Sequence, residues 1–373
     1  MQPILQFGTS RFLQAHVDLF IGEALESGNA LGRVTVVQTT SSAESARRVA
    51  AFRQGGAYPV IVRGWQDGAP YQCEHQVSSV ANALQASQDW PQVVAAAVAA
   101  QVIVSNTGDR GYELSESDNA QLLQNGRVPQ SFPAKLLVLL HARYILGAAR
   151  VTLMPCELVV NNGSVLRDVV LGLARSWDMD SAFQAWLERS CTWVNSLVDR
   201  IVSQALDPAG AVAEPYALWA IEAQPGMVLP CTHPQVVVTD HLAPYERRKL
   251  LMLNLGHTFL AEQWLTGRQP AGLTVREAMA DHALRAGLEA VWEEEVLPLF
   301  DALGEGELSR AYLAQVRDRF SNPFLDHRLA DIAQNHEEKK RRRLQPALDL
   351  AAELRLELAQ TRLRAALSSK MAA

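Results

Sequence analysis

Short apolar runs alternate with amphipathic stretches along residues 1–242. The runs have the length of buried strands, and the stretches between them have the apolar spacing of helices. The sequence predicts strands at residues 3–7, 33–38, 59–62, 73–77, 101–105, 150–154, 216–222 and 235–239. It predicts helices at residues 11–27, 89–100, 131–145, 164–176 and 179–190. Strands that alternate with helices are typical of a parallel sheet.

The pattern changes after residue 242, where the strand signals stop. Amphipathic helices are predicted at residues 244–258, 275–294, 308–320, 329–335 and 347–368. A chain of 373 residues is also too long for one ordinary core. We therefore predict an α/β protein, with a Rossmann-type domain at residues 1–242 followed by a mostly α-helical domain at residues 243–373.

The first predicted strand runs directly into a glycine turn and a helix. In nucleotide-binding folds this arrangement turns backbone N–H groups at a helix N-terminus towards a pyrophosphate. The candidate cofactor-binding residues are Gly8, Thr9, Ser10, Arg11 and Phe12. A full GxGxxG motif is absent, because Ser10 and Leu13 hold the second and third glycine positions. An ordinary strand–helix corner is the alternative interpretation.

The end of the second predicted strand should meet the adenosine ribose. The acidic residue that would hold the ribose of NAD is absent there, so Gln38 and Thr39 are the candidates for weaker contacts. Arg47 and Arg48 follow, and they could meet the 2′-phosphate of NADP. We prefer to interpret these two arginines as part of a solvated helix face.

The strand at residues 101–105 ends in Ser105, Asn106 and Thr107. Ligands of open α/β sheets lie beyond the carboxyl ends of the strands, so these residues should border the cofactor near its nicotinamide. Lys135, on the helix at residues 131–145, is a further cofactor-binding candidate.

Three polar side chains interrupt the apolar helix at residues 244–258: Lys249, Asn254 and His257. At roughly 100° per residue they fall within an arc of about 140°. An amine that moves a proton, an amide that donates to a forming alkoxide and an imidazole that orients a substrate suit chemistry on an alcohol or ketone. On a helix such residues are more commonly a solvated Lys, a surface Asn and a core His. The rest of the chain must therefore support the catalytic interpretation.

Composition restricts the class of protein. The formal net charge is −6, which is not the electrostatic signature of a nucleic-acid-binding protein. The four cysteines are scattered and form neither a metal motif nor a disulfide framework, as is typical of a reducing cytoplasm. No signal peptide and no membrane-spanning apolar run is recognised. We expect a cytoplasmic protein with no metal site and no nucleic-acid or membrane partner.

Several stretches, in order along most of the chain, resemble the polyol-specific long-chain dehydrogenase family, which includes the mannitol dehydrogenases and the hexuronate reductases. They are FGTSRFLQAH, VIVSNTGDRGYEL, SFPAKLLVLLHARY, MPCELVVNNG, NSLVDRI, EPYALWAIE, RFSNPFLDHRL and the K-x4-N-x2-H spacing of Lys249, Asn254 and His257. The stretches SNTGDRGYEL, PCELVVNNG and RFSNPFLDHRL are most similar to those of the hexuronate reductases.

The resemblance implies a Rossmann-type domain, a helical domain and a substrate in the cleft between them. It implies metal-free hydride transfer between NAD and a CH–OH group. By position, Lys249 resembles the catalytic acid/base, Asn254 the oxyanion donor and His257 the substrate-orienting imidazole. Glu246, one turn before Lys249, would modulate the proton path.

One departure from the family pattern concerns the substrate wall. Leu158 stands where mannitol dehydrogenases commonly carry an Asn that assists the oxyanion hole. Asn162, in an Asn-Asn-Gly stretch, is then the second candidate for a polar contact with substrate, although a plain turn competes with that interpretation. A basic run at residues 339–343 should be mostly solvated. Lys339 or Arg343 could instead bind a substrate carboxylate.

We therefore expect an NAD-dependent oxidoreductase that interconverts a keto-sugar acid and its polyol acid, of the tagaturonate and altronate type. NADP remains an alternative cofactor. Alternative activities are a fructuronate reductase and a neutral polyol 2-dehydrogenase of the mannitol or arabinitol type. A catalytically silent NAD-binding sensor is the alternative from another class, but it need not keep Lys249, Asn254 and His257 at working spacing. We expect a monomer or a weak homo-oligomer that acts on a small molecule.

Overall fold

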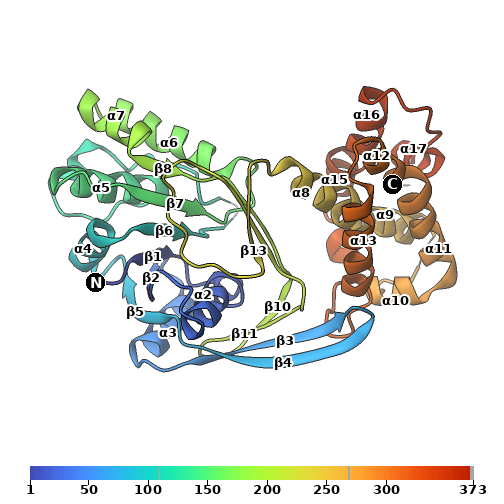
Figure 1. Cartoon of the computed structure of the whole chain (residues 1–373), viewed down its shortest axis with the longest axis horizontal. Coiled ribbons are helices and arrows are strands. Elements are labelled where there is room, and N and C mark those ends of the chain that lie inside the picture. Colours follow the sequence, from blue (N-terminus) through green and yellow to red (C-terminus); the bar gives the residue numbers. More distant parts are fainter. Residues whose placement is uncertain (109, 268, 370–373) are drawn as a thin grey trace. The chain divides into compact units, whose positions relative to one another are not determined.

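A computed structural model describes residues 1–108, 110–267 and 269–369 (Figure 1). The chain forms two compact units, each assembled from segments that are separate in the sequence. Unit 1 consists of Met1–Val62, Cys73–Ala213 and Ala217–Leu242. Unit 2 consists of Arg63–Gln72, Glu214–Tyr216 and the chain from Ala243 onward.

Unit 1 is built on a six-stranded parallel sheet with the strand order β5-β2-β1-β6-β7-β8. The strands are β1 Ile4–Phe7, β2 Val34–Gln38, β5 Val80–Gln85, β6 Val102–Ser105, β7 Val151–Pro155 and β8 Cys191–Trp193. The chain proceeds outward from β1 to β5 and then returns to place β6 on the other side of β1. This order confirms the predicted Rossmann-type fold and puts its switch point between β1 and β6.

Two strands of this sheet were not predicted from the sequence. β5 has the sequence VANALQ, in which alanine and asparagine weaken the strand signal. β8 is only three residues long, CTW. Both are held by their parallel neighbours rather than by their own propensity.

The helices of unit 1 are α1 Arg11–Gln14, α2 Val17–Glu26, α3 Ala43–Arg53, α4 Trp90–Ala99, α5 Phe132–Ile145, α6 Asn162–Ser176 and α7 Ser181–Arg189, with a 3₁₀ turn, η1, at Ala120–Leu123. Helices α4 to α7 share one continuous apolar core with the strand residues Leu5, Phe7, Ile103 and Leu153. The alternate strand residues, such as Ile4 and Val104, are equally buried and face the opposite side of the sheet.

The single helix predicted at residues 11–27 is wrong, because the chain breaks between α1 and α2. His16 leaves the helical conformation, with φ −128° and ψ −89°. Its ring Nε2 lies 3.0 Å from the carbonyl oxygen of Leu218, and the guanidinium of Arg200 donates to the carbonyl oxygen of Ala15 at 2.6 Å. Tertiary partners therefore replace the helical hydrogen bonds lost at the break.

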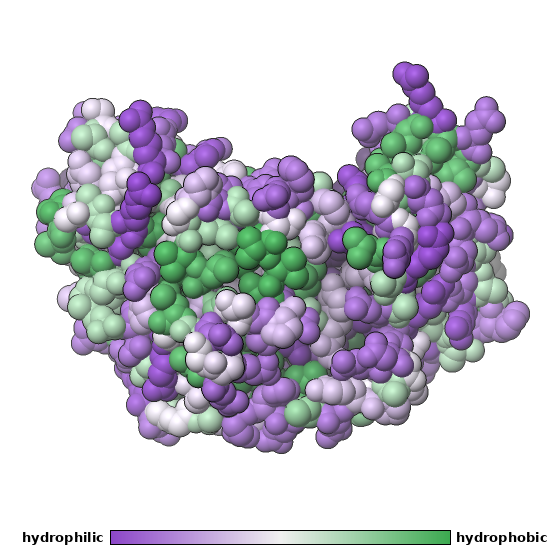
Figure 2. Space-filling model, in the orientation of Figure 1, coloured by the Kyte–Doolittle hydropathy of each residue, from purple (hydrophilic) through white to green (hydrophobic). Residues whose placement is uncertain are grey.

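The remaining described strands form two smaller sheets. One has the order β10-β11-β3-β4, formed by β3 Tyr58–Gln66, β4 Ala69–Val77, β10 Val202–Ala205 and β11 Ala211–Ala213. The other has the order β13-β12-β9, formed by β9 Ser196–Asp199, β12 Leu218–Glu222 and β13 Val236–Thr239. Hydrophobic side chains gather on the surface of unit 1 in the region where β13 runs (Figures 1 and 2), and Val238 of this edge strand is exposed.

Unit 2 is mostly helical, as predicted. Its elements are α8 Ala243–Arg248, the π-helix η2 Lys249–Asn254, α9 Leu255–Thr266, α10 Val275–Ala280, α11 His282–Ala290, the π-helix η3 Val291–Val296, α12 Leu297–Ala302, α13 Gly306–Phe320, α14 Leu329–Ile332, α15 His336–Arg343, α16 Gln345–Glu353 and α17 Thr361–Ser368. Among the described residues, no helix is both long enough and apolar enough to cross a membrane.

The helices predicted at residues 275–294 and 347–368 are each interrupted. Asp281 ends α10 and caps α11, since its carboxylate accepts from the backbone N–H groups of Ala283 and Leu284. Between α16 and α17 the chain turns at Arg355 and Gln360, both with positive φ. The Gln360 amide donates to the carbonyl oxygens of Glu295 and Ala347, each at 3.1 Å, which fixes that turn.

Residues outside the C-terminal part of the chain contribute to the interior of unit 2. The guanidinium of Arg319 forms a buried ion pair with Glu214 at 2.8 Å and lies 4.3 Å from the ring centre of Tyr216. The guanidinium of Arg63 lies 4.6 Å from the ring centre of Phe324. The segments 63–72 and 214–216 are therefore part of this packing and do not merely connect units.

A buried carboxyl group joins three elements of unit 1. Asp18 of α2 is 0% exposed and accepts hydrogen bonds from the Gln6 amide at 3.4 Å and the Tyr58 hydroxyl at 3.1 Å. Burial raises the pKa of Asp18 from 3.8 to about 7, because desolvation penalises the charged carboxylate, although the two hydrogen bonds lower it.

The Asp18→Asn variant should therefore change how stability depends on pH. Between about pH 4 and pH 7 the folded protein holds a proton that the unfolded chain has released, so the free energy of unfolding of the wild type falls, relative to the variant, as pH rises. A full pKa displacement of this size corresponds to on the order of 4 kcal/mol. Urea denaturation of both proteins across this range measures the difference, and parallel curves would contradict the assignment.

Candidate active site

The turn after β1 is shaped for close approach of the backbone at the end of β6. Gly8 has φ +120°, and a Cβ atom at this position would lie only 2.5 Å from the carbonyl oxygen of Asn106 at the end of β6. Only glycine fits this turn without strain. Ser10 caps α1, since its hydroxyl accepts from the Leu13 backbone N–H at 3.2 Å. The predicted cofactor residues Gly8 to Phe12 thus lie at the β1/β6 switch point.

The Thr9 carbonyl oxygen accepts hydrogen bonds from two side chains. The Gln14 amide donates to it at 3.1 Å and the Arg48 guanidinium at 3.4 Å. Arg48 is only 8% exposed, so the solvated position predicted for it is wrong. Arg47, in contrast, is exposed and lies 3.8 Å from Asp207. The buried Arg48 therefore stabilises the backbone of the glycine turn through its hydrogen bond to Thr9.

Gln38, at the end of β2, is committed to its own loop. Its amide nitrogen donates to the carbonyl oxygens of Thr40 at 2.7 Å and Ser42 at 3.1 Å, and its amide oxygen accepts from Gln85 at 3.0 Å. These contacts argue against the predicted ribose contact by Gln38. Thr39, which follows, is half-buried at the same end of the sheet.

A carboxylate that the sequence analysis missed organises the ends of β6 and β7. Glu157 accepts from the Ser105 hydroxyl at 3.0 Å, from the backbone N–H and hydroxyl of Thr107 at 2.9 Å each, and from the Tyr112 hydroxyl at 3.2 Å. Burial raises the pKa of Glu157 and the hydrogen bonds from Thr107 and Ser105 oppose that shift. The position of Glu157, just after the buried strand β7, was the sequence feature that could have indicated this role.

Ser105, Asn106 and Thr107 therefore form a fixed loop. The Asn106 amide donates to the Cys156 carbonyl oxygen at 2.7 Å, which ties this loop to the end of β7. Asp109, in the adjoining family motif, lies outside the described residues.

The structure gives Asn162 an internal role. It is 0% exposed; its amide nitrogen donates to the carbonyl oxygens of Pro155, Glu157 and Ser196 at 3.0–3.1 Å, and its oxygen accepts from the Gly163 and Ser196 backbone N–H groups. All of its hydrogen-bonding capacity is used inside unit 1. These contacts argue against the predicted contact with substrate.

Lys135 of α5 is also buried, and its ammonium group donates to the Gln130 carbonyl oxygen at 2.6 Å. Burial lowers the pKa of Lys135 to about 8, although the charge of Asp118 opposes the shift. The ammonium group therefore holds the segment that enters α5.

In unit 2, the segment that carries Lys249 and Asn254 is a π-helix rather than an α-helix. The backbone N–H of Leu255 donates to the carbonyl oxygen of Leu250, five residues earlier. Residues five apart share one side of such a turn, whereas in an α-helix they are separated by about 140°. The widened turn therefore brings Lys249 and Asn254 closer to one face than the sequence analysis assumed. Both side chains are half-buried.

His257 lies one turn after Asn254, on α9, and is 8% exposed. Its ring stacks on Phe320 with centroids 4.3 Å apart and meets the edge of His327 at 4.8 Å. Gly256 makes this packing possible, since a Cβ atom there would lie 2.7 Å from the Trp292 ring and 3.2 Å from Phe320. The imidazole thus has a fixed plane.

Helix α15, which contains the basic run, packs against η2 and α9. Lys339 and Arg343, four residues apart, are half-buried. The Lys339 ammonium donates to the Ile332 carbonyl oxygen at 2.7 Å, and the Arg343 guanidinium donates to the Thr258 hydroxyl at 3.4 Å. Burial lowers the pKa of Lys339, and the adjacent charge of Arg343 acts in the same direction. The two cations therefore lie beside the helix that carries His257.

Lys340 departs from the predicted solvated run. It is 1% exposed and its ammonium lies 3.5 Å from Glu262 of α9 and 3.0 Å from Glu337. Glu262 also lies 2.8 Å from His336 Nε2, which is the donor when that ring nitrogen carries the proton. Glu262 accepts a further hydrogen bond from the Ser369 hydroxyl. This buried cluster connects α15 to α9.

Comparison with known proteins assigns the chain to a family. The mannitol dehydrogenase Rossmann domain matches residues 2–228, and the mannitol dehydrogenase C-terminal domain matches residues 241–371. The chain belongs to the mannitol dehydrogenase family. This assignment confirms the resemblance drawn from the sequence and the prediction of an oxidoreductase that acts on CH–OH groups.

Two relatives named altronate oxidoreductase are similar over most of this chain. The protein from Halalkalibacterium halodurans is 34% identical across 93% of this chain and 70% of its own length. The protein from Bacillus subtilis is 31% identical across 94% of this chain and 75% of its own length.

Two solved structures share the fold. A D-sorbitol dehydrogenase in substrate-free form has a TM-score of 0.83 at 22% identity, and the match covers 98% of this chain and 79% of that one. Mannitol 2-dehydrogenase from Pseudomonas fluorescens, in a complex with NAD and D-mannitol, has a TM-score of 0.74 at 20% identity, covering 98% and 78%.

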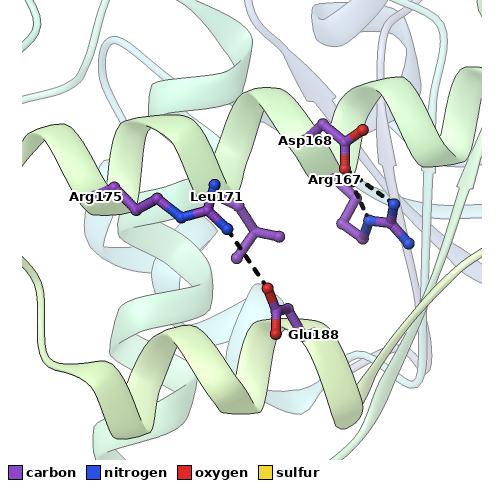
Figure 3. Close-up of a pocket in the computed structure, with 5 residues that line it drawn as sticks. All are labelled: Arg167, Asp168, Leu171, Arg175 and Glu188. Atoms are coloured by element: carbon purple, nitrogen blue, oxygen red, sulfur yellow. Dashed lines mark hydrogen bonds and ion pairs between the residues drawn. The ribbon is translucent and has the colours of Figure 1, made fainter.

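A surface depression of this mannitol dehydrogenase family member lies apart from the predicted site residues. It has a volume of about 360 Å³ and is lined by Arg167, Asp168, Leu171, Arg175 and Glu188 of α6 and α7 (Figure 3). Its charges pair off, with Arg167 3.0 Å from Asp168 and Arg175 3.6 Å from Glu188. Exposed pairs of this kind contribute little to stability, and the depression contains none of the predicted site residues.

Replacement of Gly256 by alanine tests the packing behind His257. The added methyl group would meet the fully buried Trp292 ring, so we expect a loss of roughly 1–3 kcal/mol in the free energy of unfolding. Urea denaturation measures this loss. Gly272→Ala is the matched control, because a Cβ atom at Gly272 meets nothing within 4 Å. Equal stability of the two variants would contradict the close packing.

Proposed function

We propose that this protein is an NAD-dependent oxidoreductase that interconverts a keto-sugar acid and its polyol acid, of the tagaturonate and altronate type. The observation that carries the proposal is the placement of Lys339 and Arg343 on α15, which packs against the helices carrying Lys249, Asn254 and His257. A basic pair beside an acid/base set suits a substrate that carries both a carboxylate and a reducible carbonyl group. The altronate oxidoreductases at 31–34% identity support the same substrate class.

We assign dinucleotide binding to the Rossmann-type domain, residues 1–242, and substrate binding to the helical domain that begins at residue 243. The Gly8 turn fits a dinucleotide-binding loop, because a parallel strand, a glycine turn and a capped helix N-terminus follow one another at the β1/β6 switch point. The residues that would hold the dinucleotide are Gly8, Thr9, Ser10, Arg11, Phe12, Thr39, Ser105, Asn106 and Thr107. NAD is the dinucleotide in the Pseudomonas fluorescens complex of the same fold.

When bound, the reduced dinucleotide supplies the hydride for ketone reduction. Lys249, as an ammonium ion, donates a proton to the carbonyl oxygen, which becomes the hydroxyl of the product. Asn254 donates a hydrogen bond to the oxygen as negative charge develops on it. Within the described part of the chain, no residue forms a hydrogen bond with the Asn254 side chain, and this supports a role towards substrate.

His257 orients the substrate by a hydrogen bond to a hydroxyl next to the reacting carbon. Lys249 becomes neutral when it gives up its proton and recovers one from solvent, and Glu246, three residues earlier, lies on this path in our proposal. In the direction of oxidation the same groups act in reverse, with neutral Lys249 as the base.

The cytoplasm is the compartment that we propose. Cys73, Cys156, Cys191 and Cys231 are all free thiols, which a reducing compartment preserves.

A substrate panel tests the proposed activity. NADH oxidation should be supported by tagaturonate or fructuronate and only weakly by fructose, since a neutral ketose offers no carboxylate to Lys339 and Arg343. The Lys249→Ala variant should lose roughly 100- to 10,000-fold in kcat, the usual contribution of a general acid. Turnover of neutral ketoses alone would instead identify a polyol 2-dehydrogenase, and NADH binding without any turnover would identify a silent sensor.

The carboxylate role is tested by Lys339→Met and Arg343→Met. Loss of a charge-assisted hydrogen bond costs about 1.5–3 kcal/mol, so KM for the sugar acid should rise roughly 10- to 100-fold while KM for a neutral polyol changes little. Arg341→Met, an exposed change on the same helix, is the control. Equal increases in KM for acid and neutral substrates would refute the assignment.

A further inference from the structure

A second histidine, His327, adjoins the proposed substrate residues and has no part in the mechanism above. It lies between α13 and α14 in unit 2. Its ring meets that of His257 edge to face, with centroids 4.8 Å apart and planes inclined at 68°. The His257 ring also stacks on Phe320, with centroids 4.3 Å apart. His327 is therefore a polar neighbour of the imidazole that we propose to orient the substrate.

The backbone fixes where His327 stands. Its carbonyl oxygen accepts from the Val275 backbone N–H at 2.9 Å. The next residue, Arg328, forms an antiparallel β-bridge with Thr274, and the Leu329 backbone N–H donates to the Leu273 carbonyl oxygen at 2.9 Å. These contacts hold residues 327–329 against residues 273–275, so the half-buried ring of His327 has a fixed backbone.

The charged groups around His327 come from two helices. Asp331 of α14 and the cations Lys339 and Arg343 of α15 are all close enough to act on its titration. Burial lowers the pKa of His327 below 6.5 and both cations lower it further, whereas Asp331 raises it. Near neutral pH the ring is therefore uncharged, although it stands beside the two cations.

An uncharged imidazole offers one N–H donor and one acceptor nitrogen. Such a group suits a hydroxyl, which both donates and accepts, better than it suits a carboxylate. His327 contacts the ring of His257, which we propose to hold a hydroxyl next to the reacting carbon, and the charges of Lys339 and Arg343 act on His327 as well. An open-chain sugar acid carries hydroxyl-bearing carbons between its carbonyl group and its carboxylate.

We propose that His327 binds a substrate hydroxyl that lies between the reacting carbon and the carboxylate, and that it helps select polyhydroxy acids over simple keto acids. The proposal rests on the proposed function for the orientation of the substrate. His327 is then a residue that determines substrate specificity. The alternative is that its ring only packs against the His257 ring and holds it in place.

Two variants separate the two roles. His327→Phe keeps a ring edge against His257 but removes both nitrogens, whereas His327→Gln keeps a donor and an acceptor. For the hydroxylated keto-sugar acid we expect KM to rise roughly tenfold or more with Phe and less with Gln, in line with loss of one buried hydrogen bond. For a deoxy analogue that lacks the intervening hydroxyl, KM should be unchanged by either variant.

The matched control is His282→Phe, an exposed histidine at the start of α11 in the same unit. It should change neither KM. If His327→Phe raises KM equally for the hydroxylated acid and the deoxy analogue, or lowers only kcat, the ring only packs against the His257 ring and the proposal is overturned.

A binding measurement without turnover distinguishes this proposal from the proposed function. The ring-proton resonance of His327, assigned by its absence in His327→Gln, is followed by NMR during titration with altronate in the absence of NAD. Altronate should shift the resonance and raise the pKa of His327, because its carboxylate offsets the charges of Lys339 and Arg343. Mannitol should shift the resonance while leaving that pKa in place.

No shift with saturating altronate or mannitol would overturn the role of His327. Turnover of neutral polyols alone, together with a mannitol-induced shift, would overturn the sugar-acid function and keep His327 as a hydroxyl-binding residue.

Discussion

The widened helical turn at Lys249–Asn254 is the constraint on which the proposed chemistry depends. A regular α-helix would separate these two side chains by about 140°, whereas hydrogen bonding over five residues places them on one side. The widening displaces the backbone, and the indole N–H of Trp292 donates to the Met252 carbonyl oxygen at 3.1 Å inside the turn. Trp292 itself belongs to a second π-helix, so the two irregular turns support each other. Gly256 then allows Trp292 and Phe320 to approach the base of His257.

The same helix is linked to the basic pair by buried polar groups. The Thr258 hydroxyl donates to the Asn254 carbonyl oxygen at 2.9 Å and accepts from Arg343, so one hydroxyl connects the proposed oxyanion donor with a proposed carboxylate ligand. Glu262 and Lys340 form the second link, deeper in the unit. Buried charges of this kind do not maximise stability, but each fixes the partner that it faces. We interpret this cluster as the contact that sets α15 against α9.

The elements that sequence alone predicted are those whose own residues specify them. The continuous apolar runs of β1, β2, β6 and β7 predict buried parallel strands. β5 lacks such a run and depends on its neighbour β2. The break at His16 depends on Arg200 and Leu218, far away in the sequence. The π-helix has the same leucine-rich pattern as an α-helix, so periodicity does not distinguish the two. Lys340 reads as one cation in a solvated run, and only its distant partner Glu262 reveals its burial.

Several polar residues that the sequence singled out in unit 1 have partners inside the protein. At the end of the parallel sheet, polar side chains expected to touch the cofactor or the substrate are bonded to the protein: Gln38 to its own loop, Asn162 to three carbonyl oxygens, and Ser105 and Thr107 to Glu157. They shape the loops at the β1/β6 switch point, where we propose that the dinucleotide binds. In our proposal, substrate recognition in unit 2 rests instead on side chains. A fold organised in this way can keep one cofactor while side chains on a few helices change the substrate.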